Sequence, residues 1–134
     1  MARLILDTGV LITGQQGRLD LAVLAGDDDV VVPTMAVAEY LAGVALGGDP
    51  ARRAAETTFL DELLAVTPTF DYTVPVARAH AELLAHVRRT GQPRGAHDLV
   101  IAACAVAADR VLVTTDAKAR FEELPGVRAR LLDP

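Results

Sequence analysis

Four acidic residues stand where an apolar run of the sequence ends or the following apolar helix begins. Asp7 directly follows a short apolar run near the start of the chain, and Asp116 follows another after two threonines. Asp98 lies in the first turn of a long apolar stretch, and Glu39 lies further along a second one. In a parallel sheet, strand ends and the next helix starts meet at one edge. We therefore expect the four carboxylates to converge.

Converging carboxylates need a positive partner, because like charges at short range raise one another's pKa values. The chain has 18 acids and 13 lysines and arginines, a formal net charge of −5; removing these four acids leaves 14 against 13. All-oxygen ligation by carboxylates selects hard cations, Mg²⁺ or Mn²⁺, over zinc. Such a site activates a water molecule and stabilises charge on a phosphoryl oxygen. The pattern therefore predicts metal-dependent hydrolysis of a phosphate ester, with no nucleophilic side chain.

Each acid also has a purely structural interpretation. Asp7 suits a turn, Asp116 suits a helix cap, and Asp98 suits the positive end of a helix dipole. Glu39 is harder to explain in this way, because it is the only charged residue between Thr34 and Gly48. The alternative there is a single exposed glutamate on an apolar helix. The predicted cluster would be absent only if all four structural interpretations were correct.

Apolar runs alternate with helical patterns along the whole chain, which predicts a three-layer α/β/α fold with a mostly parallel central sheet. The Asp-Thr-Gly sequence at residues 7–9 is interpreted as a turn after the first strand. Strands are expected at Arg3–Leu6, Val30–Val32, Thr69–Tyr72, Val111–Val113 and, at an edge, Ala129–Leu132. Helices are expected at Leu19–Ala25, from Pro33 to about Leu46, from Asp49–Pro50 to Pro68, from Thr73 to Thr90, at Gly95–Ala108 and near Lys118–Glu122.

Composition limits the class of protein. The 134 residues (14.1 kDa) suit one domain, residues 1–134, and 51% hydrophobic content excludes disorder. The longest apolar run, Leu99–Ala108, is too short to span a bilayer, and Asp7 comes too early for a signal-peptide core. We therefore expect a soluble, cytoplasmic protein without a membrane partner. Cys104 is the only cysteine, which excludes an internal disulfide and a cysteine-based zinc site.

Charge and aromatic content argue against two kinds of nucleic-acid binder. A chain with a net charge of −5 is not a simple duplex coat, since such proteins are usually basic. Tryptophan is absent and aromatic residues make up 4%, so a base-stacking platform of the RRM type is not expected.

The segments around the four acids resemble the motifs of PIN-domain nucleases, in order and across essentially the whole chain. Within that superfamily the resemblance is greatest to VapC-type toxins of bacterial type II toxin–antitoxin pairs. The matching segments are Leu4-Ile-Leu-Asp7-Thr8-Gly9, Ala36-Val-Ala-Glu39-Tyr-Leu-Ala-Gly43, His97-Asp98-Leu-Val-Ile-Ala-Ala103 and Val113-Thr114-Thr-Asp116, the last with Phe121.

The resemblance implies a metal-dependent endoribonuclease that, as a toxin, inhibits translation. Asp7, Glu39, Asp98 and Asp116 would form the catalytic site and hold Mg²⁺ or Mn²⁺, and Asp116 matches the family's most variable acid. Thr8 and Thr114 would be supporting residues: Thr8 stands beside the first acid, and Thr114 matches a hydroxyl residue of the fourth motif. The resemblance also implies a VapB-type antitoxin whose tail blocks the site, and a homodimer.

RNA would approach this acidic site only if basic residues surround it. Candidates for phosphate contacts stand before the third motif and after the fourth, and each has the alternative of a solvated helix end. They are Arg88, Arg89, Arg94, Lys118 and Arg120, with Arg18 as a further possibility. His97 is interpreted as a surface residue, with substrate contact as the alternative, and His80 as a core histidine with its polar atoms satisfied.

Three rival functions remain open. A signalling receiver domain has a similar size and class, but Lys118 comes too soon after the threonine pair, Thr114 and Thr115, to match its usual layout. A PIN-domain RNA-processing nuclease outside a toxin–antitoxin pair would use the same four acids. A non-catalytic PIN-like interaction module would not need all of them.

Overall fold

A single five-stranded sheet organises the chain, in the strand order β3-β2-β1-β4-β5, and every neighbouring pair is parallel. The structure is a computed structural model that describes residues 1–134. The three-layer α/β prediction is therefore confirmed, and the sheet is entirely parallel. The strands are β1 (Arg3–Leu6), β2 (Asp29–Pro33), β3 (Thr69–Phe70), β4 (Val111–Thr114) and β5 (Ala129–Leu131).

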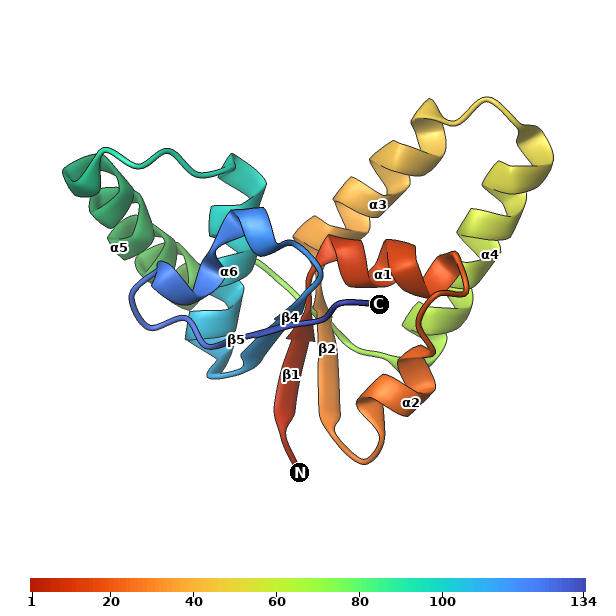
Figure 1. Ribbon diagram of the computed structural model, residues 1–134, viewed down its shortest axis with the longest axis horizontal. Helices are drawn as coiled ribbons and strands as arrows, with labels where there is room; N and C mark the ends of the chain where they lie inside the picture. The colour runs from red at the N-terminus through yellow and green to blue at the C-terminus, as the bar shows by residue number, and fades with distance from the viewer.

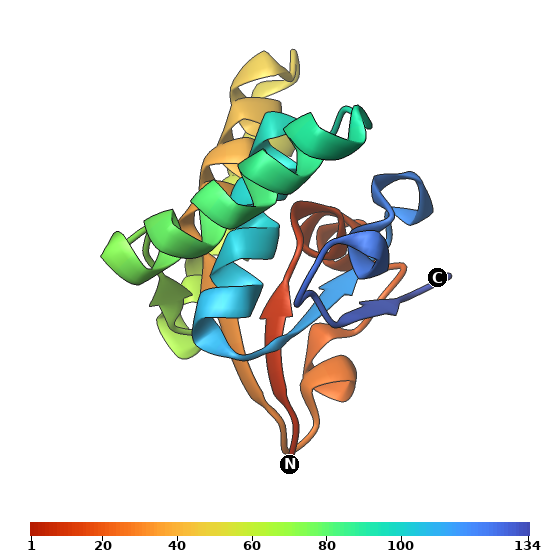
Figure 2. The ribbon, with the colours of Figure 1, turned by 90° about the vertical axis from the view of Figure 1, so that its left-hand side faces the viewer.

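Helices connect the strands and cover both faces of the sheet, as parallel pairing requires. Figure 2 shows α5 and α6 on one side of the strands and α1 on the other. In Figure 1 the α3–α4 pair and the α5–α6 pair diverge above the carboxyl ends of the strands. The helices are α1 (Thr8–Gln15), α2 (Leu21–Ala25), α3 (Thr34–Leu46), α4 (Pro50–Val66), α5 (Val74–Thr90) and α6 (Ala96–Ala108), with 3-10 turns η1 (Ala117–Ala119) and η2 (Phe121–Glu123).

Local sequence signals explain where these helices begin and end. The side chain of Asp49 accepts a hydrogen bond from the backbone N–H of Ala51 and caps α4, whose first residue is Pro50. Helix α5 ends at Gly91, which adopts φ +64°, a left-handed conformation that glycine takes without steric cost. These boundaries match the predicted ones to within a residue or two.

The hydrophobic core lies around β1, β4 and α6. Helix α6 buries seven of its thirteen residues, which confirms the predicted central buried helix. Its apolar residues contact α5 on one side and β4 on the other. None of the helices is both long enough and apolar enough to cross a bilayer. The core therefore fixes the amino end of α6, which carries Asp98, against the sheet.

Two predicted features were wrong. The segment after Asp7 is helix α1 rather than a turn, although Gly9 and Gly14 lower its helix propensity. A Cβ at Gly14 would lie 2.9 Å from Leu21 Cγ, so glycine there permits close packing of α2. The predicted helix near Lys118–Glu122 is instead η1 and η2, separated by Arg120 in a left-handed conformation (φ +48°).

Candidate functional site

Asp7 stands where β1 leads into α1, and it is 5% exposed. Its Oδ1 accepts a hydrogen bond from the backbone N–H of Thr8 (2.8 Å), so the carboxylate caps α1. Its Oδ2 accepts from the Thr114 hydroxyl at the end of β4 (2.7 Å). Burial raises the pKa of Asp7 above its usual value, and the two hydrogen bonds oppose that shift. A buried carboxylate with these donors is held in one orientation.

Glu39 joins three elements of the site. The Thr8 hydroxyl, on α1, donates a hydrogen bond to Oε1 of Glu39 on α3 (2.7 Å). Nδ1 of His97, on α6, lies 3.3 Å from Oε2. The Glu39 side chain is 28% exposed, so it is neither a solvated surface acid nor a fully buried one. Its helix brings it to the same edge of the sheet as Asp7.

Asp98 lies in the first turn of α6 and has the most perturbed carboxylate of the site. Burial raises its pKa to about 6, and repulsion from Asp7, Asp116 and Glu39 adds to the rise, while His97 lowers it. The four carboxylates therefore lie close enough to repel one another.

Asp116 follows β4 and holds η1 in place. Its Oδ1 accepts hydrogen bonds from the backbone N–H groups of Lys118 (2.9 Å) and Ala119 (3.2 Å). Its own backbone N–H donates to the Thr114 hydroxyl (3.0 Å), and the same hydroxyl donates to Asp7. Thr114 thus connects the first acid of the site to the last. The structural interpretation of Asp116 as a cap is confirmed, and it coexists with a place in the acidic cluster.

Arg94 connects the α5–α6 loop to the segment after β4. Its Nη1 donates to the backbone carbonyl of Ala119 and to that of Arg120, the latter at 2.8 Å. This guanidinium therefore positions Asp116 relative to Asp98, a role that its sequence position did not reveal. Contact of Arg94 with a phosphate remains a prediction.

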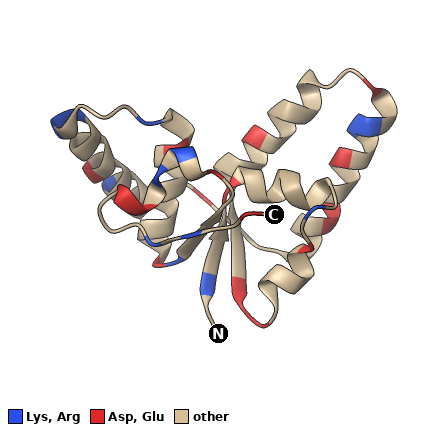
Figure 3. Ribbon diagram, viewed as in Figure 1, with Lys and Arg blue, Asp and Glu red and all other residues tan.

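The other predicted basic residues do not all lie beside the acids: Lys118 and Arg120 line a pocket with Asp98 and Asp116, Arg88 lines a second pocket, and Arg89 lines neither. Arg88 and Arg89 are exposed in the last turn of α5, and Lys118 is exposed in η1. Arg120 is exposed, and its Nε lies 3.7 Å from a carboxylate oxygen of Glu123. Figure 3 shows basic segments at the end of α5, in the α5–α6 loop and in η1.

A small polar pocket of about 170 Å³ brings acids and bases together. It holds two of the four acids and three of the predicted basic residues. This combination suits a phosphodiester whose negative charge meets the cations while its reacting centre faces the acids. The lining residues are Pro93, Arg94, Gly95, Asp98, Asp116, Lys118, Ala119 and Arg120.

The acidic cluster has the donor chemistry of a hard-cation site, but its side chains are not arranged around an ion. No three His, Cys, Asp or Glu side chains stand at the spacing that one metal ion requires. Each oxygen of Asp7 accepts one hydrogen bond and keeps a further lone pair. The all-oxygen donor set therefore fits Mg²⁺ or Mn²⁺, provided that the acidic side chains reorient.

Two features of the site were missed or underestimated from sequence. A Cβ at Gly95 would lie 2.9 Å from Oδ2 of Asp98, so glycine leaves room for that carboxylate. The sequence indication of this role was the position of Gly95 directly before the helix that carries Asp98. His97 is exposed as predicted, yet it contacts Glu39. His80 is half-buried, and its Nδ1 lies 2.9 Å from the Tyr72 hydroxyl, so its polar atom is satisfied.

The chain matches a known protein family along most of its length. The PIN domain family model matches residues 4–127. Ribonuclease VapC of Rickettsia bellii (strain RML369-C) is 23% identical over 122 residues, which cover 91% of this chain and 90% of that protein.

Solved structures of similar fold come from toxin–antitoxin complexes. VapBC2 from Rickettsia felis, bound to a DNA fragment from their promoter, gives a TM-score of 0.86 at 23% identity, covering 98% of this chain and 99% of that one. VapBC-5 from Mycobacterium tuberculosis, a member of the VapBC family of toxin–antitoxin systems, gives 0.81 at 28% identity, covering 98% and 100%.

Proposed function

The chain belongs to the PIN-domain family, and from that membership we propose that it is a metal-dependent endoribonuclease, the toxin of a VapBC-type pair that inhibits translation. The observation that carries the proposal is the convergence of Asp7, Glu39, Asp98 and Asp116 at the carboxyl ends of β1 and β4. The similarity to a VapC ribonuclease supports RNA as the substrate.

Asp7, Glu39, Asp98 and Asp116 would hold one or two ions of Mg²⁺ or Mn²⁺. A divalent cation in such a site lowers the pKa of water and neutralises charge on a phosphoryl oxygen. Thr114 orients Asp7, and Thr8 orients Glu39, through the hydrogen bonds described above. Both hydroxyls donate hydrogen bonds to carboxylates of the site, and we assign them a positioning role, with a water molecule as the nucleophile.

We expect the predicted basic residues to bind the RNA backbone. Arg88, Arg89 and Lys118 are exposed and form no ion pair within the chain, so their charges are available to phosphates. Arg94 and Arg120 line the pocket that contains Asp98 and Asp116. The cations offset the negative charge of the four acids and allow the RNA to approach.

The metal requirement is tested by RNA cleavage with the purified chain. We expect cleavage in Mg²⁺ or Mn²⁺, loss of cleavage when EDTA is added, and recovery when excess Mn²⁺ is restored. Cleavage that persists in the chelator would refute the mechanism. No cleavage with either ion, for a folded chain and a range of RNAs, would favour a non-catalytic PIN-like module.

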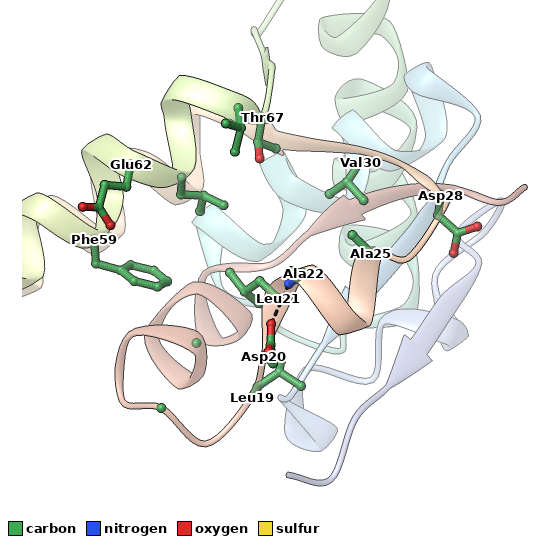
Figure 4. A pocket seen from close by; sticks show the side chains of 14 residues that line it. Leu19, Asp20, Leu21, Ala22, Ala25, Asp28, Val30, Phe59, Glu62 and Thr67 are labelled. Carbon is green, nitrogen blue, oxygen red and sulfur yellow. Dashed lines mark hydrogen bonds between the residues drawn. The ribbon is translucent and has the colours of Figure 1, made fainter.

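An apolar pocket of about 690 Å³ between α1–α2 and α4 is the candidate surface for the antitoxin. Figure 4 shows the ring of Phe59 directed toward Leu21 across this pocket. Leu63 and Val66 also line it, and Val66 is 82% exposed. Apolar surface of this kind is typical of a protein interface. The VapBC complexes of similar fold support a VapB-type antitoxin as the partner.

The exposed apolar residues of the α3–α4 pair also favour a homodimer. Leu46 is 88% exposed, and Leu41 on the same helix is 41% exposed. We expect the purified chain alone to sediment as a dimer and to form a stable complex when it is co-expressed with its antitoxin. A monomer that exposes no partner surface would contradict this part of the proposal.

A further inference from the structure

A second pocket, of about 400 Å³, lies beside the acidic cluster, between the end of α5 and the start of α6. We name it the base pocket. Its volume falls within the roughly 300–1,000 Å³ that small-molecule sites occupy. Four of its eight lining residues are hydrophobic, and two are arginines. The lining residues are Leu84, Val87, Arg88, Gly91, Pro93, Arg94, Ala96 and Leu99.

The base pocket is continuous with the site of the proposed reaction. Pro93 and Arg94 line both the base pocket and the small polar pocket that contains Asp98 and Asp116. Ala96 and Asp98 stand two residues apart in the first turn of α6. A molecule that places a charged group in the small polar pocket, beside Asp98, therefore places the adjoining group in the base pocket.

The chemistry of the base pocket matches a nucleotide. A nucleobase is flat and largely apolar on its faces, and its phosphate is anionic. Leu84, Val87 and Leu99 offer apolar contact, while Arg88 is exposed, unpaired and able to contact a phosphate or a base face. Proteins that bind unstacked bases use aromatic rings or guanidinium planes. No aromatic residue lines this pocket, so the exposed guanidinium of Arg88 takes that role, because that of Arg94 is hydrogen-bonded to the backbone carbonyls of Ala119 and Arg120.

We propose that the base pocket receives one unpaired base of the RNA, next to the phosphodiester that is cleaved. This inference rests on the proposed function, because it places the scissile phosphate at Asp98 and Asp116. A base held within a duplex must leave its stack before it can enter, which costs energy. The pocket therefore selects RNA that is single-stranded at the cleavage position. Its apolar side chains recognise the shape of the base rather than the hydrogen-bonding groups on its edges.

The test combines a change in the protein with a change in the RNA. Ala96 is exposed and lines the pocket, so Ala96→Phe fills it without altering the core. Ala55→Phe, at an exposed position of α4, is the matched control. The RNA is a hairpin with its cleavage site in the loop, prepared also with a single abasic nucleotide at each loop position in turn.

With the wild-type chain, one abasic position beside the cleavage site should lower kcat/KM by roughly 5- to 100-fold, the range expected for loss of one stacked base. Ala96→Phe should lower cleavage of intact RNA by a similar factor, and the abasic nucleotide should then cause no further loss. Ala55→Phe should behave as the wild type. Independent, multiplicative losses would overturn the proposal, as would abasic positions that have no effect.

Binding measurements separate this inference from the proposed function. Fluorescence anisotropy with the Asp98→Asn chain reports RNA binding without cleavage. The base pocket is supported if abasic RNA binds more weakly than intact RNA and if Ala96→Phe removes this difference. This result would hold even if the wild type cleaves nothing. Equal binding of both RNAs would overturn it even if cleavage is robust. Loss of antitoxin binding without any effect on RNA would also overturn it, by assigning the pocket to the antitoxin.

Discussion

Asp98→Asn is expected to lower RNA cleavage by on the order of 100-fold or more, beyond the 10–100-fold typical of residues that only support a metal ligand. The substitution keeps the size of the side chain and removes the charge that would bind a divalent cation. The measurement is kcat/KM for RNA cleavage in saturating Mn²⁺. Near-wild-type cleavage would show that Asp98 takes no part in the reaction.

The same substitution should stabilise the metal-free chain at neutral pH. The pKa of Asp98 is raised to about 6, against an ordinary 3.8, so ionisation is less favourable in the folded state. The stability that this group contributes is present below about pH 4 and is lost as the pH rises through about 6. In EDTA, the Tm of Asp98→Asn should exceed that of the wild type by more at pH 7 than at pH 4.5. A Tm difference that is constant with pH, or reversed, would contradict the electrostatic account. A higher Tm of the variant would also show that its loss of activity is not caused by unfolding.

Thr114→Val should lower cleavage by about 10–100-fold, the usual cost of losing a group that orients a metal ligand. Valine has the shape of threonine but neither donates to Asp7 nor accepts from the Asp116 backbone. Because the lost hydrogen bond had lowered the pKa of Asp7, that pKa should rise. Asp7 then stays protonated to higher pH, and the loss of activity should be greatest at low pH.

Thr114→Ser is the matched control, because it keeps the hydroxyl and removes only a methyl group from a buried position. We expect it to retain most of the activity and the pH profile of the wild type. Equal losses in the serine and valine variants would indicate packing at residue 114, rather than the hydrogen bonds, as the important contribution. A pH-independent loss in the valine variant would argue against its action through Asp7.

The meeting of the four acids was predictable because it follows from topology. Once β1 and β4 are parallel neighbours, Asp7 and Asp116 come to the same edge, and helices that start there carry Glu39 and Asp98 to it. Glu39 was the most informative residue, since a single acid in an apolar helix needs a partner. Its partners, the Thr8 hydroxyl and His97, come from two other helices.

What was not predictable depends on backbone geometry or long-range packing. The sequence indicates only that Arg94 is a basic residue near the third motif. In the structure it donates hydrogen bonds to the carbonyls of Ala119 and Arg120, where the backbone is left-handed at Arg120. Helix α1 contains two glycines, and the Asp7 cap together with packing against Leu21 and the core explains why it forms. In both cases the deciding contacts join segments that are separated in the sequence.

The strand order has a consequence for the chain as it leaves the ribosome. β1 is synthesised well before its partner on one side, β4, which begins at Val111. Until that strand is available, Asp7 lacks the Thr114 hydroxyl and Asp116 does not yet exist in the nascent chain. The four acids of the candidate site therefore cannot come together until the chain has been synthesised as far as Asp116.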